Sequence, residues 1–304
     1  MIKAPKGCEL IAADFSQIEA RVSAWLSKEP SSLEVFRRNG DIYLDAASKI
    51  FGKKITKDDK HERQVGKVAT LALGYGGAVG AFQAMSKGYG LKVSDRRADS
   101  IRKAWRESHP NITQFWAALE GAALLATNTE LEVIYVNKQI SFRKAGSFLQ
   151  CRLPSGRKLT YPYPRLEMCG YYKTGYKVNT VRKSNLARDV DYQMALDADK
   201  AWEKPTLFYK SNNNGSFYHR STYGGSPAEN VTQGVARDLL AWAMMRFEHQ
   251  GLKIVMHIHD EIVIEVPENS VSLDHVVELM EVPPMWAGDL PIAAQGWKAK
   301  RFKK

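Results

Sequence analysis

The sequence predicts an α+β protein, because strand-like segments near both ends of the chain enclose a mainly helical middle. Near the start, Glu9–Asp14 is an apolar run that closes on an acid. Near the end, Ile254–Val266 is rich in β-branched residues that favour extended structure. This second run is interrupted at its centre by His259-Asp260-Glu261, which predicts two strands joined by a turn.

Two acids far apart in the sequence, Asp14 and Asp260, each stand at the end of a predicted strand. Carboxylates placed in this way can converge on cations, and a phosphoryl-transfer site with two metal ions requires such a pair. An acid at the tip of a hairpin is also commonly a solvated turn residue, so the pair needs support from other segments.

Apolar residues at helical spacing predict helices along the first half of the chain. One helix runs from residue 17 to residue 27 with Ser16 as its cap, and another covers residues 41–51. Residues 95–127 form an amphipathic helical stretch that Pro110 must interrupt.

The second half of the chain has a more mixed pattern. Strands are predicted over 131–136 and 159–161, and residues 153–157 are expected to form the turn between them. Residues 170–220 are rich in Lys, Asn, Tyr and Gly, which is typical of a solvated loop, with a nucleic-acid contact as the alternative. Helix signals return at residues 227–250.

Composition favours a folded protein with a polyanionic partner. A chain of 304 residues with 44% hydrophobic content can bury a substantial core. Lys and Arg outnumber Asp and Glu by 44 to 33, which gives a formal net charge of +11 and favours nucleic acid as a partner. No long apolar run or secretory segment is evident, so we expect a cytoplasmic protein without a membrane partner. Cys8, Cys151 and Cys169 lack the spacing of a disulfide framework or a zinc site.

Three blocks of the sequence carry a family resemblance. Asp14-Phe-Ser-Gln-Ile-Glu-Ala-Arg21, Arg63-Gln-Val-Gly-Lys67-Val-Ala-Thr-Leu71-Ala-Leu-Gly-Tyr75-Gly76 and His259-Asp260-Glu261 resemble, in this order, motifs A, B and C of the family A, polymerase I-like DNA polymerases. Residues 153–157 and 223–240 are similar to the bacteriophage branch of that family.

The resemblance implies the fold of a right-hand polymerase, with a palm of antiparallel sheet and helices and with mainly helical fingers. It assigns residues 1–30 and 221–304 to the palm and residues 31–220, with an insertion, to the fingers. The thumb and the exonuclease domain are expected to be absent, since Asp14 lies so near the start. We therefore expect a fragment or a minimal polymerase in a bacterial or phage-infected cell, with a second chain as the source of thumb, exonuclease or processivity function.

Motifs A and C supply the expected metal site. Asp14 and Asp260 are the natural ligands of two Mg²⁺ ions, with Mn²⁺ as an alternative, because hard oxygen donors suit these cations. The backbone carbonyl of Phe15 is expected to add a ligand. The resemblance gives Glu261 a secondary role near the metal or the primer end, with a solvated turn acid as the alternative. It places His259 near the primer backbone.

Motif B supplies the expected triphosphate site. Its candidate residues recur every four positions, so a single helix would align them along one face. They are Arg63, Lys67, Leu71 and Tyr75. The face runs from cationic to apolar, which matches the phosphates at one end of a nucleoside triphosphate and the sugar and base at the other. Lys67 is also a candidate for protonating the leaving pyrophosphate, whereas an ordinary basic helix face is the alternative.

The resemblance adds Gln17, Glu19 and Tyr43 to the dNTP site. Glu19 matches a family position that crowds the sugar 2′ position, so a ribonucleotide hydroxyl would clash there. Tyr43 stands where the family often has a histidine, and it can donate a hydrogen bond to phosphate but cannot carry a positive charge.

Further residues are expected to contact DNA. Gln233, Asn230 and Arg220 match positions near the template-primer minor groove, where side-chain donors meet acceptors that all correct base pairs share. Arg157 is a further candidate, although an arginine at a strand turn is commonly just exposed.

These expectations combine into a template-directed DNA polymerase core. It would add dNTPs to the 3′ end of a primer-template by two-metal-ion phosphoryl transfer, releasing pyrophosphate, and would be poorly processive alone. The main alternative is a non-catalytic or partner-dependent DNA-binding replication module. A terminal transferase or gap-filling activity is intermediate, and a single-subunit RNA polymerase is disfavoured by Glu19 and by the His-Asp-Glu form of motif C.

Overall fold

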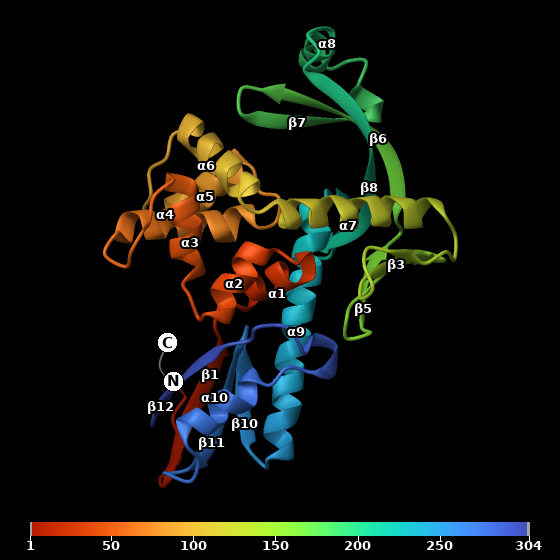
Figure 1. Cartoon of the computed structure of the whole chain (residues 1–304). Helices are drawn as coiled ribbons and strands as arrows, with labels where there is room; N and C mark the ends of the chain where they lie inside the picture. The colour runs from red at the N-terminus through yellow and green to blue at the C-terminus, as the bar shows by residue number, and fades with distance from the viewer. Residues whose placement is uncertain (1, 303–304) are drawn as a thin grey trace. The chain divides into compact units, whose positions relative to one another are not determined.

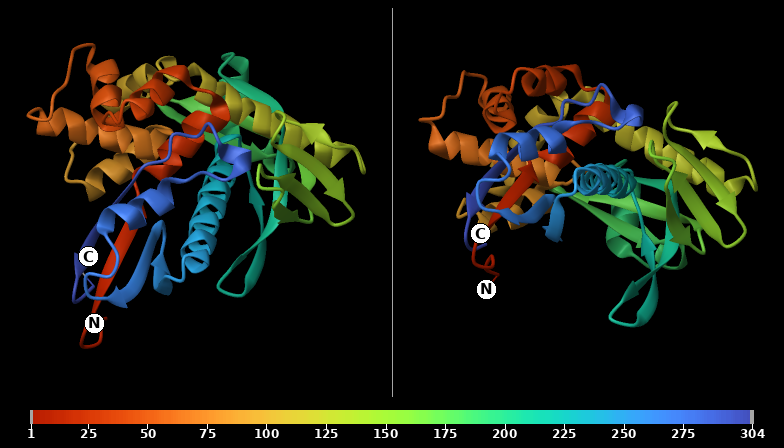
Figure 2. Two further views of the ribbon diagram at one scale, coloured as in Figure 1. Left: turned by 60° about the horizontal axis from the view of Figure 1, so that its bottom comes forward. Right: turned by 90° about the horizontal axis from the view of Figure 1, so that it is seen from below.

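The structure is a computed structural model that describes residues 2–302 (Figures 1 and 2). The chain divides into a first unit and a second unit that are each compact. The first comprises residues up to 26, 32–40 and from 232 onward, and the second comprises residues 27–31 and 41–231. Naming these units palm and fingers remains a prediction.

The first unit is built on an antiparallel sheet in the order β10-β11-β1-β12. Its strands are β10 (Lys253–Ile258), β11 (Glu261–Pro267), β1 (Cys8–Phe15) and β12 (Ala294–Ala299). β1 pairs with β11 on one side and with β12 on the other. The predicted hairpin near the end of the chain is confirmed, because β10 and β11 pair across a tight turn at His259 and Asp260.

The sheet is covered on both faces, which explains why β1 reads as a continuous apolar run. Leu10 and Ala12 pack with Val263 on one face, and Ile11 and Ala13 are fully buried on the other. Helix α10 (Leu273–Glu281) contacts β1 and β12, and Figures 1 and 2 show it running alongside them.

Among the described residues, three further α-helices belong wholly or partly to the first unit. They are α1 (Ile18–Ser27), α2 (Pro30–Arg37) and α9 (Gly225–His249). Helix α1 begins one residue later than predicted, because Gln17 has a left-handed φ of 50° rather than a helical one. The long helix predicted before the last hairpin is confirmed as α9.

The second unit begins with helices. These are α3 (Ile42–Phe51), α4 (Lys60–Leu73), α5 (Val79–Gly88), α6 (Asp95–Glu107) and α7 (Pro110–Asn128). Asp41 caps α3 by accepting hydrogen bonds from the backbone N–H groups of Tyr43 and Leu44. The predicted break at Pro110 is confirmed, since α6 ends before it and α7 begins on it.

Sheets and helix α8 (Val190–Asp197) make up most of the rest of the second unit. One has the order β2-β3-β4-β5 and the other has the order β7-β6-β8-β9. The strands of the first are β2 (Ile134–Tyr135), β3 (Ser141–Ala145), β4 (Phe148–Arg152) and β5 (Lys158–Pro162). The strands of the second are β6 (Arg165–Thr174), β7 (Lys177–Arg182), β8 (Ala201–Asn213) and β9 (Ser216–Ser221), with α8 between β7 and β8.

The loop predicted over residues 170–220 is therefore wrong. The strands there are stabilised by contacts across the sheet, such as the stacking of Tyr171 on Trp202 with ring centroids 6.0 Å apart. Composition cannot reveal such pairing because the partners lie far apart in the sequence. The strand predicted over 131–136 shrinks to Ile134–Tyr135. Among the described residues, no helix is both long and apolar enough to cross a membrane.

Candidate active site

Motifs A and C meet at one end of the sheet in the first unit. Asp14 lies directly opposite Glu261 in the β1–β11 ladder. The backbone N–H of Phe15 donates a hydrogen bond to the carbonyl of Asp260, with 3.2 Å between nitrogen and oxygen. The fold thus brings together the two segments that carry these acids, although the segments are remote in sequence.

The turn that carries Asp260 has an unusual backbone. His259 has a left-handed φ of 56°, and a hairpin turn with a positive φ at its first central residue normally uses glycine there. A non-glycine residue in this region costs roughly 1–2 kcal/mol. Residues with a strained backbone cluster at functional sites, so this turn is a candidate part of an active site.

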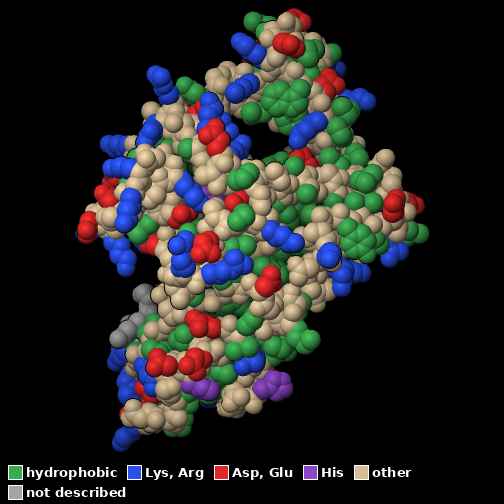
Figure 3. Space-filling model, in the orientation of Figure 1, with side chains coloured by type: hydrophobic (Ala, Val, Ile, Leu, Met, Phe, Trp, Pro, Cys, Tyr) green, Lys and Arg blue, Asp and Glu red, His purple; other side chains and the backbone are tan. Residues whose placement is uncertain are grey.

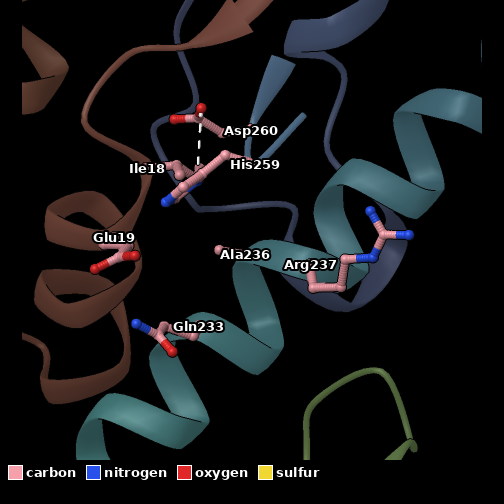
Figure 4. Close-up of a pocket in the computed structure, with 7 residues that line it drawn as sticks. All are labelled: Ile18, Glu19, Gln233, Ala236, Arg237, His259 and Asp260. Atoms are coloured by element: carbon pink, nitrogen blue, oxygen red, sulfur yellow. Dashed lines mark ion pairs between the residues drawn. The ribbon is translucent and has the colours of Figure 1, made fainter. Parts of the chain in front are cut away.

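A hollow of about 230 Å³ lies beside this turn, within the first unit (Figure 4). Its lining comes from α1, α9 and the turn, and consists of Ile18, Glu19, Gln233, Ala236, Arg237, His259 and Asp260. Figure 4 shows the side chains of Glu19 and Gln233 facing each other from the two helices. Predicted residues from motif A, α9 and motif C are therefore brought together around one space.

The histidine and the acid of the turn interact. His259 Nδ1 lies 3.6 Å from Asp260 Oδ1, and the histidine side chain is 69% exposed, whereas that of Asp260 is 31% exposed. Asp260 is therefore open enough to bind a ligand. Glu261 is only 5% exposed, so the alternative that it is a solvated turn acid is wrong.

Sequence reasoning missed Arg21, which fixes the loop between β1 and α1. Its Nε donates to the carbonyl of Ser16 at 2.7 Å, and its Nη1 donates to the carbonyl of Pro291 at 2.8 Å. Its guanidinium carbon lies 4.6 Å from the ring centroid of Phe36. A basic residue between two apolar ones, Ala20 and Val22, was the available signal. Arg237 was also missed as a lining residue, and its Nη1 lies 3.4 Å from Nδ1 of His257.

The donor set at this site suits a hard cation. Among the described residues, no group of three or more His, Cys, Asp or Glu side chains is arranged to hold a metal ion. Asp14, Asp260 and the carbonyl of Phe15 are all oxygen donors at one end of the sheet. Mg²⁺ is usually held by one or two carboxylates together with substrate phosphates, so these residues fit Mg²⁺ in the presence of a nucleotide.

In the second unit, motif B forms α4, and this helix carries three of its four candidate residues. Arg63, Lys67 and Leu71 lie within it at four-residue spacing. The expectation that Tyr75 continues this helical row is wrong, because α4 ends at Leu73. The glycines that follow explain the end, since Gly76 has a left-handed φ of 72°.

The cationic end of α4 is held by α3 and its cap. Arg63 Nε and Nη2 lie 2.8 Å and 2.7 Å from Asp41 Oδ2, and the Arg63 guanidinium carbon lies 5.6 Å from the ring centroid of Tyr43. Lys67 Nζ lies 5.1 Å from the ring centroid of Tyr89, a residue that sequence reasoning missed. Asp41 thus both caps α3 and orients Arg63.

Burial raises the pKa of Tyr43, and the neighbouring Asp41 and Tyr89 raise it further, while Arg63 acts against them. The phenol therefore keeps its proton at neutral pH and can donate a hydrogen bond. Gly66 makes this arrangement possible, because a Cβ at that position would overlap the carbonyl oxygen of Tyr43. Without a side chain there, α4 packs closely against α3.

The remaining DNA-contact candidates belong to the second unit, whereas the hollow that Gln233 lines lies in the first unit. Asn230 donates from Nδ2 to the hydroxyl of Tyr161 at 3.2 Å, so one of its donors has an internal partner. Arg220 is exposed on β9, and Arg157 is exposed in the turn between β4 and β5. Their roles remain predictions.

Comparisons with known proteins place the chain in a family. A sequence model described as DNA polymerase family A matches residues 1–133. The DNA polymerase of Bacillus phage SP02 is 35% identical over 302 residues, which cover 98% of this chain and 42% of the phage protein. This chain belongs to DNA polymerase family A.

Other family A proteins agree. The DNA polymerase I of Aquifex aeolicus is 34% identical over 120 residues, which cover 37% of this chain and 21% of that protein. The solved POL domain of Pol1 from M. smegmatis, in complex with a DNA primer-template and dNTP, is 18% identical with a TM-score of 0.59, and the match covers 99% of this chain and 41% of that one. This likeness confirms the predicted fold. The family A chain spans about two fifths of the length of the phage polymerase and of the solved domain.

Proposed function

We propose that this family A chain is the catalytic core of a template-directed DNA polymerase that adds dNTPs to a primer 3′ end. The observation that carries the proposal is the joining of motifs A and C, in which Asp14 faces Glu261 and the N–H of Phe15 binds the carbonyl of Asp260. Family membership gives these acids their chemical context.

Asp14, Asp260 and the carbonyl of Phe15 would hold two Mg²⁺ ions, or Mn²⁺ in their place. When bound, the ions neutralise charge on the attacking and leaving oxygens of the phosphoryl transfer. Glu261, which is buried opposite Asp14, would take a secondary role near the metal or the primer end. His259 is exposed beside Asp260 and would contact the primer backbone.

The hollow beside the turn would receive the sugar of the incoming nucleotide and the end of the primer-template. Glu19 lines it from α1, where its carboxylate would crowd a 2′-hydroxyl and so favour dNTPs. Gln233 lines it from α9, where its amide would donate to the minor-groove acceptors that correct base pairs share. Gln17, at the start of α1, would contact the nucleotide next to Glu19.

The α4 helix would bind the triphosphate. Arg63 is oriented by Asp41 and would meet the outer phosphates, and Lys67 would donate a proton to the leaving pyrophosphate. Tyr43 keeps its proton and would donate a hydrogen bond to the same phosphates. Leu71 would lie against the sugar and base, with Tyr75 beyond the end of the helix.

Primer extension tests the proposal. The chain would be incubated with a labelled primer-template, dNTPs and Mg²⁺ beside Asp260→Asn and beside a template-free control. Asp274→Asn is the matched control, because Asp274 is an exposed acid of the same unit on α10. We expect template-matched extension that Asp260→Asn abolishes and Asp274→Asn retains.

Product length in the same assay tests the expected low processivity. DNA binding without extension by the unmodified chain would instead support the alternative of a replication module that depends on a partner. Extension without template dependence would contradict the proposal.

A further inference from the structure

The β2-β3-β4-β5 sheet of the second unit has two chemically different faces. Phe142 on β3 pairs with Cys151 on β4, and both are fully buried. Leu149 and Tyr161 pair across β4 and β5 and are also buried. This apolar face packs on the α7 side, since α7 contacts β2, β3 and β4. Because side chains alternate along each strand, the intervening residues, such as Arg143, Gln150 and Arg152, lie on the opposite face.

The opposite face is polar and basic. The strand register forms a row across it from Tyr135 through Ser141 and Arg152 to Lys158. A neighbouring row contains Arg143 and Gln150. These residues and Val133 line a hollow of about 280 Å³. We call this set of seven residues the basic sheet face.

The cations of the basic sheet face are available to a ligand. Arg143, Arg152 and Lys158 are all exposed, and none of them forms an ion pair with another described residue. Of the described residues that line the hollow, none is acidic. Cations gathered around one hollow repel one another unless an anion lies between them, so the face is electrostatically complementary to phosphates.

An aromatic side chain stands among these cations. Tyr135 is 65% exposed and occupies the end of the row, on β2. A ring in this position can stack on an unpaired base, and stacking platforms within basic grooves are how single strands are bound without sequence preference. Bases within a duplex are already stacked on each other and cannot use the platform.

We propose that the basic sheet face binds single-stranded DNA, with phosphates on Arg143, Arg152 and Lys158 and a base on Tyr135. The row crosses three strand-to-strand steps, roughly 14 Å at about 4.8 Å per step, which suits a segment of a few nucleotides. The proposal goes beyond the polymerase activity because strand binding needs no catalysis. It rests on the proposed function only in the choice of DNA as the nucleic acid.

Charge alone does not single out this face. Figure 3 shows Lys and Arg side chains spread widely over the visible surface of the chain. What distinguishes the basic sheet face is that its cations, an exposed ring and a hollow share one side of one sheet (β3 and β5 in Figure 1). A matched control must therefore remove equal charge elsewhere in the same unit.

The test is fluorescence anisotropy of a labelled single-stranded oligonucleotide of mixed sequence, without dNTPs, over a range of salt concentrations. The variant Arg143→Ala/Arg152→Ala/Lys158→Ala is compared with Lys87→Ala/Lys92→Ala/Arg96→Ala. The control residues are exposed, and both triple variants lose the same formal charge. We expect the first variant to bind at least about tenfold more weakly, with a salt slope smaller by about 2, and the control to stay within about twofold.

Variants of Tyr135 measure the contribution of stacking separately from that of charge. Tyr135→Ala should weaken binding about fivefold, and Tyr135→Phe should retain it, because the ring rather than the hydroxyl forms the platform. Thermal unfolding checks that each variant remains folded. Equal losses in the two triple variants would overturn the proposal, as would an equal loss of affinity for a duplex of the same length in the first triple variant, or tighter binding of single-stranded RNA.

The same experiment distinguishes this proposal from the proposed function. Asp260→Asn should lose primer extension and keep single-strand binding. If the unmodified chain binds single-stranded DNA through the basic sheet face but cannot extend a primer, only the proposed polymerase activity is contradicted. If the chain extends a primer but its binding of single-stranded DNA does not depend on the basic sheet face, only the present inference is contradicted.

Discussion

Arg21 offers a quantitative test of how the motif A loop is held. The change Arg21→Met keeps a long side chain but removes every donor. It would leave the carbonyls of Ser16 and Pro291 without the guanidinium that now binds them at 2.7 Å and 2.8 Å. It would also remove the cation from the ring of Phe36.

The size of the effect follows from burial. Arg21 is 3% exposed, so the two carbonyls would lose their partner in a site with little access to water. Each buried acceptor left unpaired costs roughly 1–3 kcal/mol, and the lost cation–π contact adds about 1 kcal/mol. Part of this loss is offset because Met, unlike Arg, does not place a charge in the folded interior. The net loss in the free energy of unfolding is about 3 kcal/mol. This is a large part of the roughly 5–15 kcal/mol that stabilises a typical protein.

Urea unfolding followed by tryptophan fluorescence measures this loss. Arg38→Met is the matched control, because the Arg38 side chain is 70% exposed and pairs with Glu34 one helical turn away. Such a surface pair contributes only about 0.3–0.5 kcal/mol. A loss in Arg21→Met that is no larger than the loss in Arg38→Met would refute the reasoning that Arg21 anchors the loop.

Three further predictions address substrate choice, chemistry and pH. Glu19→Ala should raise the kcat/KM of a ribonucleotide relative to the matching dNTP by at least about tenfold; an unchanged ratio in single-nucleotide incorporation would contradict the role of Glu19. Lys67→Met should lower kcat for incorporation by at least about 100-fold, whereas a change in KM alone would limit Lys67 to binding. Burial lowers the pKa of His109 below its ordinary value of 6.5. As the pH drops below about 6.5, the unfolded state therefore binds a proton before the folded state does. The free energy of unfolding should then fall by up to about 1.4 kcal/mol per pH unit. His109→Gln should flatten that dependence in urea unfolding, and an unchanged slope would count against it.

The features of the fold that sequence predicted well depend on local patterns. The hairpin around His259 and Asp260 follows from β-branched runs on both sides of a polar break, and the break between α6 and α7 follows from Pro110. The sheet over residues 165–221 was not predictable in this way. Its strands are selected by pairing with distant segments, as in the stacking of Tyr171 on Trp202.

The sequence indicated candidate site residues but not the residues that support them. Motif order indicated that Asp14 and Asp260 work together, and the β1–β11 pairing brings their segments to the same end of one sheet. Arg21, which holds the motif A loop, and Asp41, which orients Arg63 of motif B, were missed because their roles depend on carbonyls and helix ends that only the fold places nearby. Tyr75 was misplaced because periodicity continued past the glycines that end α4.

The most direct test of the central claim is a double-mutant cycle on single-turnover primer extension with Asp14→Asn, Asp260→Asn and the variant with both changes. If the two acids hold the same ions, each single change should lower the rate by about a thousandfold, and the double change should lower it little further. Independent losses that multiply in the double variant, or retention of activity in either single variant, would contradict a shared site built from motifs A and C.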